Sequence, residues 1–131
     1  MVLIIKYNAG NIRSVLFALE RIGVKAEVTD DVKKIQSADK VIFPGVGEAS
    51  TAMHYLKERG LDEVIKNLKQ PVLGICLGMQ LMCKYSEENS TECLGIFDEQ
   101  VKRFGGEGLG LRFRKLDGIT FLILSLPSSM M

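Results

Sequence analysis

The stretch PVLGICLGMQLMCKY, residues 71–85, decides the fold, because it leads from a buried strand into a helix through a tight turn. Residues 71–75 form a short apolar run, which is typical of a strand inside a parallel sheet. Cys76 follows, and Leu77 to Tyr85 has the apolar spacing of a helix. A strand that runs directly into a helix is the repeating unit of parallel α/β folds.

Three further strand-and-helix units precede this stretch. Each begins with a short run of apolar or alternating residues and continues, after a turn, with apolar residues at helical spacing. The alternation predicts an α/β fold, a parallel sheet flanked by helices, of the flavodoxin-like type. We expect strands at Val2–Ile5, Val24–Thr29 and Val41–Phe43, and helices over 12–22, 31–37, 49–59 and 61–68, with Asn11 and Asp30 as N-caps and Gly23 as a stop.

Cys76 is the candidate nucleophile at the turn. Gly74 and Gly78 flank it and allow the sharp strand-to-helix turn of a nucleophile elbow. The dipole and unpaired amides of a helix N-terminus favour the thiolate, which is the reactive form. The amide of Leu77 is expected to donate to an oxyanion, and the loop Gly45–Gly47 to supply a second donor. A small buried cysteine is the structural alternative, and the flanking glycines argue against it.

Three segments, in chain order, resemble a known family. Gly74–Leu81 resembles the nucleophile motif of class I, triad-type, glutamine amidotransferases. Within that family, Tyr7–Asn11 and Pro44–Gly47 are similar to the glutaminase subunit of imidazole glycerol phosphate synthase. The resemblance covers residues 1–104 and implies the N-terminal part of an amidotransferase domain that is truncated at its C-terminal end.

The resemblance implies hydrolysis of glutamine to glutamate and ammonia, without cofactor or metal. The ammonia would pass to a cyclase subunit, in a heterodimer that forms imidazole glycerol phosphate for histidine biosynthesis. Cys76 would attack the side-chain amide carbon and form a thioester, which water then cleaves. The remaining residues that the resemblance assigns are Gly45, Val46 and Gly47 near the oxyanion, Gln80 at the substrate, and Asn8 and Asn11 facing the cyclase.

The base for this thiol is not identifiable in the sequence. A cysteine nucleophile needs a base, usually a histidine that is oriented by a carboxylate. The one histidine, His54, follows Gly47 by two helical turns, roughly 10 Å along a helix axis, and we interpret it as a surface residue. The family's histidine and glutamate lie near its C-terminus, and nothing after Phe104 matches them. The sequence therefore predicts a nucleophile without its base.

The tail, residues 105–131, does not resemble the family. A hypothetical DNA stretch GTT CCG CAA ATT GGA TGG AAT AAC encodes Val-Pro-Gln-Ile-Gly-Trp-Asn-Asn, which resembles the family's continuation. Translated from its second base it gives Phe113–Thr120, and the same shift applies to Leu122–Met131. We therefore infer a frameshift near Gly105, in the gene or its cloned copy. The apolar run Ile119–Leu126 predicts self-association of the tail, as an added strand.

Composition narrows the function further. The 131 residues are 47% apolar and 25% charged, with a net charge of +1, as expected of a soluble globular chain. We see no basic patch for nucleic acid, no membrane span and no signal peptide, so we expect the cytoplasm. Cys83 is interpreted as a core residue and Cys93 as a bystander. Two alternatives stay open: a glutaminase or cysteine hydrolase of another pathway, and a non-catalytic flavodoxin-like binding module with an unreactive Cys76.

Overall fold

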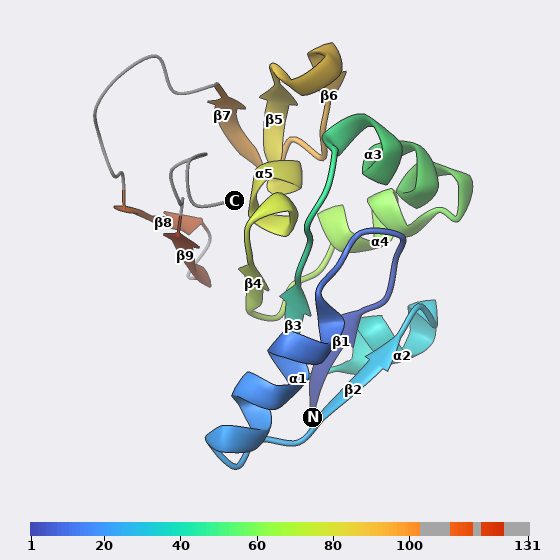
Figure 1. The fold of residues 1–131 in the computed structure, drawn as a ribbon, viewed down its shortest axis with the longest axis vertical. Helices are drawn as coiled ribbons and strands as arrows, with labels where there is room; N and C mark the ends of the chain where they lie inside the picture. Colours follow the sequence, from blue (N-terminus) through green and yellow to red (C-terminus); the bar gives the residue numbers. More distant parts are fainter. Residues whose placement is uncertain (103–110, 117–118, 125–131) are drawn as a thin grey trace.

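A four-stranded parallel sheet forms the centre of the protein (Figure 1). The computed structural model describes residues 1–102, 111–116 and 119–124. The strand order is β2-β1-β3-β4, so the chain moves one way from the first strand to the second and then reverses. The predicted parallel α/β fold is confirmed. The strands are β1 (Val2–Ile5), β2 (Ala26–Thr29), β3 (Lys40–Phe43) and β4 (Val72–Gly74).

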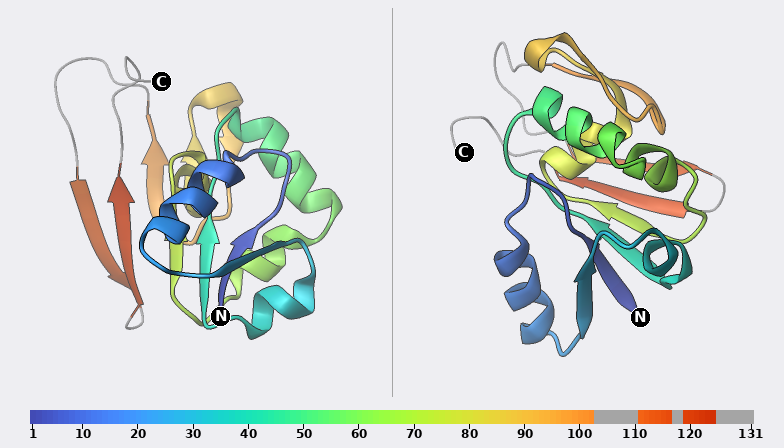
Figure 2. Two further views of the ribbon diagram at one scale, coloured as in Figure 1. Left: turned by 60° about the horizontal axis from the view of Figure 1, so that its bottom comes forward. Right: turned by 90° about the vertical axis from the view of Figure 1, so that its right-hand side faces the viewer.

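The reversal of direction places the helices on both faces of the sheet, because crossovers between parallel strands are right-handed. Figure 2 shows α1 on one side of the sheet and α2 on the other. No helix in the described part of the chain is long and apolar enough to cross a membrane. The helices are α1 (Ile12–Arg21), α2 (Val32–Ser37), α3 (Ala49–Glu58), α4 (Leu61–Lys66) and α5 (Leu77–Met82).

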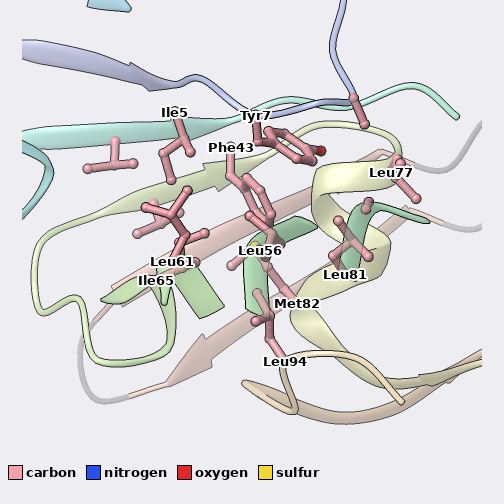
Figure 3. Close-up of a cluster of buried hydrophobic side chains, with 14 of the residues drawn as sticks. Ile5, Tyr7, Phe43, Leu56, Leu61, Ile65, Leu77, Leu81, Met82 and Leu94 are labelled. Carbon is pink, nitrogen blue, oxygen red and sulfur yellow. The ribbon is translucent and has the colours of Figure 1, made fainter. Parts of the chain in front are cut away.

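The core lies between the sheet and the helices α2 to α5 (Figure 3). Leu3 and Ile5 of β1 and Phe43 of β3 belong to this cluster, and each is almost completely buried. Because side chains alternate along a strand, Ile4 and Ile42 point to the opposite face, where α1 lies. Among the described residues, the two faces of the sheet are therefore covered unequally, with α2 to α5 on one face and α1 on the other.

Helix α1 buries less than its sequence predicts. Its apolar stripe is only half-buried and no residue of α1 is fully buried. Phe17 is 53% exposed, and Ile22, the C-cap residue, is 71% exposed. Asn11 occupies the N-cap position, but its side chain makes no capping hydrogen bond, which corrects the prediction of a side-chain cap. Gly23 ends the helix as predicted, with a φ of +73° and its N–H donating to the carbonyl of Glu20.

The second predicted cap is displaced by one residue. The side chain of Asp31, not Asp30, accepts a hydrogen bond from the Lys34 amide at 3.1 Å. Asp31 has extended backbone angles at this point, which is the geometry that an N-cap requires. The two adjacent aspartates cannot be distinguished by sequence pattern alone.

The helix after Cys76 is shorter than predicted. Helix α5 ends at Met82, and Cys83 already has extended backbone angles. The chain continues as β5 (Cys83–Ser86), which pairs in parallel with β7 (Phe97–Val101) and antiparallel with β6 (Thr91–Glu92). A short 3₁₀ helix, η1 (Glu88–Ser90), connects β5 to β6. Pairing with residues more than ten positions away overrides the local helical pattern.

The tail contributes two described strands. Strands β8 (Leu111–Leu116) and β9 (Ile119–Leu124) pair with each other in antiparallel register, and β9 lies alongside β4. Among the described residues, no strand pairing joins this hairpin to the four-stranded sheet, so β8 and β9 form a two-stranded sheet of their own. The predicted boundary between residues 104 and 105, and the last two residues of the apolar run, lie outside the described residues.

Candidate active site

Cys76 lies at a strained turn between β4 and α5. Its backbone angles, φ +50° and ψ −117°, are ones that residues other than glycine rarely adopt. Such a conformation costs about 1–3 kcal/mol and persists only where the surroundings enforce it. The turn is enforced by two hydrogen bonds of 3.0 Å, from the Gly78 amide to the Ile75 carbonyl and from the Gln80 amide to the Cys76 carbonyl.

The two glycines that flank the turn allow close backbone contact. A Cβ on Gly78 would lie 1.8 Å from the carbonyl oxygen of Phe43, at the end of β3. A Cβ on Gly74 would lie 2.8 Å from the Cα of Met79. The turn can therefore pack directly on β3 and on its own helix only with glycine at both positions. The sequence prediction of an elbow at Cys76 rests on this pair.

The loop after β3 lies against the elbow. The amide of Leu77 donates to the carbonyl of Gly45 at 3.1 Å. The Leu77 amide, which we expect to donate to an oxyanion, is therefore engaged with the Gly45 carbonyl in this conformation. Val46 is 53% exposed, and Gly47 has a φ of +125°, so the rest of the loop extends into solvent.

The thiol environment also differs from expectation in the length of the helix. Helix α5 has six residues, fewer than predicted, so its dipole at Cys76 is weaker. Cys76 is half-buried, and Gln80 is half-buried one turn further along. The structure thus brings Gly45, Leu77 and the elbow together, with Gln80 on the adjacent helical turn.

His54 does not serve the elbow in this structure. It lies on α3, its side chain is 77% exposed, and its Nε2 is 3.3 Å from a carboxylate oxygen of Glu58 on the next helical turn. This agrees with its interpretation as a surface histidine.

The other two cysteines differ from Cys76 in their surroundings. Burial raises the pKa of the Cys83 thiol and of the Cys93 thiol to about 11 each, so both favour the protonated form.

The predicted partner-facing residues lie on the segment that follows β1. Asn8 and Asn11 are exposed, and the Asn8 side-chain amide donates to the carbonyl of Thr51 at 3.4 Å. Thr51 is in the first turn of α3, so this segment contacts the helix that follows the loop 44–47.

Within residues 1–102 and the described tail strands, no group of three or more His, Cys, Asp and Glu could hold a metal ion.

Sequence reasoning missed an anchoring cluster at the start of α3. Glu48 caps this helix: its carboxylate accepts from the amides of Ser50 and Thr51, at 2.7 and 3.0 Å. Hydrogen bonds from these two residues lower the pKa of Glu48 far below its usual value. Asn89 donates to the same carboxylate at 2.8 Å, which ties η1 to α3. A glutamate before a helix is a weak capping signal, and the contact with Asn89 depends on the fold.

Two open cavities lie away from the elbow. Their volumes are about 220 and 290 Å³, and both lie beside α3, next to the segment from η1 to β6. Met53, Lys57 and Glu92 line both of them. Cys76 and the loop 44–47 line neither cavity, so the predicted site depends on backbone geometry at the elbow.

Known proteins resemble this chain in sequence and in fold. A sequence model described as the SNO glutamine amidotransferase family matches residues 5–108. The chain is 68% identical over 103 residues to imidazole glycerol phosphate synthase subunit HisH of Bacteroides thetaiotaomicron, over 79% of this chain and 53% of that protein. It is 51% identical over 108 residues to the HisH subunit of Haemophilus influenzae, over 82% of this chain and 54% of that protein.

A solved structure of a glutamine amidotransferase shares the fold. Its TM-score is 0.67 at 19% identity, and the match covers 86% of this chain and 62% of the other. The chain spans about half the length of the curated relatives that it matches.

Proposed function

Since the chain belongs to the SNO glutamine amidotransferase family, we propose that it carries the nucleophile of a glutaminase that supplies ammonia to a synthase. The observation that supports this most directly is the elbow at Cys76, a strained turn between two close-packed glycines. A merely structural cysteine does not require such strain, whereas a nucleophile that must project from a sheet edge does.

The proposed reaction is a two-step acyl transfer. The Sγ of Cys76 attacks the side-chain amide carbon of glutamine and forms a C–S bond, while the C–N bond breaks and ammonia leaves with one added proton. Water then attacks the thioester carbon, breaks the C–S bond and releases glutamate. Each step passes through an oxyanion that needs hydrogen-bond donors. Gln80, one turn beyond the elbow, is proposed to contact the substrate.

The oxyanion donors require a change from the conformation described above. The Leu77 amide donates to the Gly45 carbonyl, so it becomes available only when the Gly45–Val46 peptide turns away. The same rotation would direct the Val46 amide toward the elbow, which gives a pair of donors. The glycines at 45 and 47 make the rotation sterically feasible. We therefore assign Gly45, Val46, Gly47 and Leu77 to the proposed oxyanion site.

In the proposed mechanism, the base is the histidine that the family carries near its C-terminus, oriented by a glutamate. No residue of this chain matches either of them. The one histidine of the chain is exposed on α3 and paired with Glu58. The 131-residue chain is therefore expected to hold a nucleophile with almost no turnover, since loss of triad members removes most of the catalytic acceleration. We propose that the tail after residue 104 is translated out of frame, and that this is why the chain does not match the histidine and glutamate of its family.

The proposed partner is a cyclase subunit. The HisH name of the relatives assigns them to imidazole glycerol phosphate synthase, and we extend that assignment to this protein, in histidine biosynthesis and in the cytoplasm. Asn8 and Asn11, exposed on the segment after β1, are proposed to face the cyclase.

A glutamine-like electrophile tests the nucleophile assignment. 6-Diazo-5-oxo-norleucine should modify Cys76 in a version of the chain whose reading frame is restored after residue 104, mixed with the cyclase. Cys76→Ser should abolish both the label and ammonia release, and Cys93→Ser, the matched control, should retain both. Modification of Cys83 instead, or full turnover by the 131-residue chain, would contradict the proposal. A bound flavin in the purified protein would favour the binding-module alternative.

A further inference from the structure

The buried hydroxyl of Tyr7 contacts the loop beside the elbow, and none of the roles above uses it. It lies 2.5 Å from the carbonyl oxygen of Pro44, to which it donates. We infer that Tyr7 is a positioning residue: by holding the Pro44 carbonyl, its hydroxyl sets the orientation of the Gly45–Val46 peptide against the Leu77 amide. The relevance of that peptide to an oxyanion rests on the proposed function, whereas the hydrogen bond itself does not.

Packing fixes the Tyr7 ring. The residue is 6% exposed, and its ring centroid lies 5.2 Å from that of Phe43, at an interplanar angle of 44°. The hydroxyl oxygen, red in Figure 3, points toward the start of α5, where Leu77 lies. Burial raises the pKa of Tyr7 far above its usual 10.0, so the group stays a hydrogen-bond donor at any physiological pH.

Gly45 packs closely against both this hydroxyl and the elbow. A Cβ on Gly45 would lie 2.1 Å from the Tyr7 hydroxyl, and 3.0 Å both from the amide nitrogen of Gly78 and from the Cβ of Leu77. The side of Gly45 from which a Cβ would project is therefore closely packed, by the Tyr7 hydroxyl and by the first turn of α5. This close packing and the hydrogen bond to the Pro44 carbonyl together restrain the Gly45–Val46 peptide.

A second contact joins the same segment to the helix that follows the loop. Asn8, the next residue along the chain, donates to the carbonyl of Thr51 at 3.4 Å. The segment 7–8 thus contacts the first residue of the loop 44–47, Pro44, and the helix that follows the loop, at Thr51. Of the two contacts, that of Tyr7 is buried and adjoins the peptide that engages Leu77, so we assign the positioning role to Tyr7.

Hydrogen exchange in the 131-residue protein tests this role. Tyr7→Phe removes the hydroxyl and leaves the ring in place, so the Pro44 carbonyl loses a buried donor. We expect exchange of the Leu77 amide to accelerate about tenfold. The Ile75 amide, which donates to the Phe43 carbonyl at 3.0 Å, is the internal control and should change little. The matched control variant is Tyr55→Phe, which removes the hydroxyl of a tyrosine on α3 beside Arg59 and should leave exchange of the Leu77 amide unchanged.

Equal acceleration at Leu77 and Ile75 would indicate a general loss of stability and overturn the positioning role, as would unchanged exchange at Leu77. If Tyr7→Phe does not fold, the unaltered protein decides. Its Tyr7 hydroxyl proton should exchange slowly enough to be observed by NMR and should show a nuclear Overhauser contact to the Gly45 amide proton. Absence of that resonance overturns the inference. Neither measurement involves glutamine, so each is independent of the proposed glutaminase activity.

Discussion

Cys76 should react with an aromatic disulfide reagent well before Cys83 and Cys93, and burial sets the size of the difference. The pKa of each of the latter two thiols is raised from 9.0 to about 11. At about pH 8 this lowers their thiolate fraction about 100-fold relative to a free cysteine. Higher basicity makes each thiolate more nucleophilic, with a Brønsted coefficient of about 0.4–0.5, which offsets the loss by roughly six- to tenfold.

The net expectation for Cys83 and Cys93 is labelling at least roughly tenfold slower than a free thiol, before any further delay from restricted access. Cys83 is 7% exposed, so access slows it further. Labelling of both should accelerate as pH rises toward 11, because the raised pKa keeps them protonated below it. Cys76 lies at the half-buried turn and should account for the fast phase.

Stopped-flow absorbance followed by peptide mapping gives the order of labelling. Cys76→Ser should remove the fast phase, and Cys93→Ser should leave it unchanged. In denaturant all three thiols should react at similar rates, which shows that the difference arises from the fold. Preferential labelling of Cys83 or Cys93 in the native protein would refute both the elbow assignment and the burial argument.

Three further predictions concern the elbow, the α3 cap and the tail. Gly78→Ala should lower the free energy of unfolding by about 1–3 kcal/mol or more, because its Cβ would meet the Phe43 carbonyl at 1.8 Å. Gly10→Ala is the control and should cost much less, because its Cβ would meet Ile12 at an ordinary 3.4 Å. Equal losses of unfolding free energy in urea titration would contradict the packing argument. Glu48→Gln should lower the melting temperature at neutral pH, and its difference from the unaltered protein should shrink as pH falls below 4.5, the usual pKa of a glutamate. The reason is that a carboxyl whose pKa is lowered by folding stabilises the protein only at pH values where the unfolded-state carboxyl is also ionised. A difference in melting temperature that does not depend on pH would count against the cap. Cutting the chain after residue 104 should change its oligomeric state or solubility if β8 and β9 mediate self-association. Light scattering that shows a monomer both with and without the tail would reject that proposal.

The parallel sheet was predictable because its signals are local. Val2–Ile5 and Val41–Phe43 are short apolar runs between turn residues, and this pattern is sufficient to assign buried strands. The elbow was predictable for the same reason, since two glycines around a cysteine lie within five residues of sequence. The end of α5 was not predictable, because Cys83 pairs with Phe97, and such distant pairing leaves no trace in helical spacing.

The details of the site also exceeded what the sequence carries. The glycines indicate that the loop 44–47 comes close to Leu77, but they do not show that the Gly45 carbonyl already accepts from the Leu77 amide. Tyr7 belongs to a recognisable segment, yet a tyrosine after a strand is an ordinary core residue until its hydroxyl is located. Main-chain orientation and buried hydroxyl partners depend on how distant segments meet.

The thin cover that α1 provides implies two levels of stability within one molecule. No side chain of α1 is fully buried, whereas the cluster beneath α2 to α5 contains many fully buried residues. Opening of α1 would expose Ile4 and Ile42 and leave that cluster intact. Proteases should therefore cleave first near the exposed end of α1 at Ile22, at denaturant concentrations well below global unfolding. The sheet would then outlast the helix that covers one of its faces.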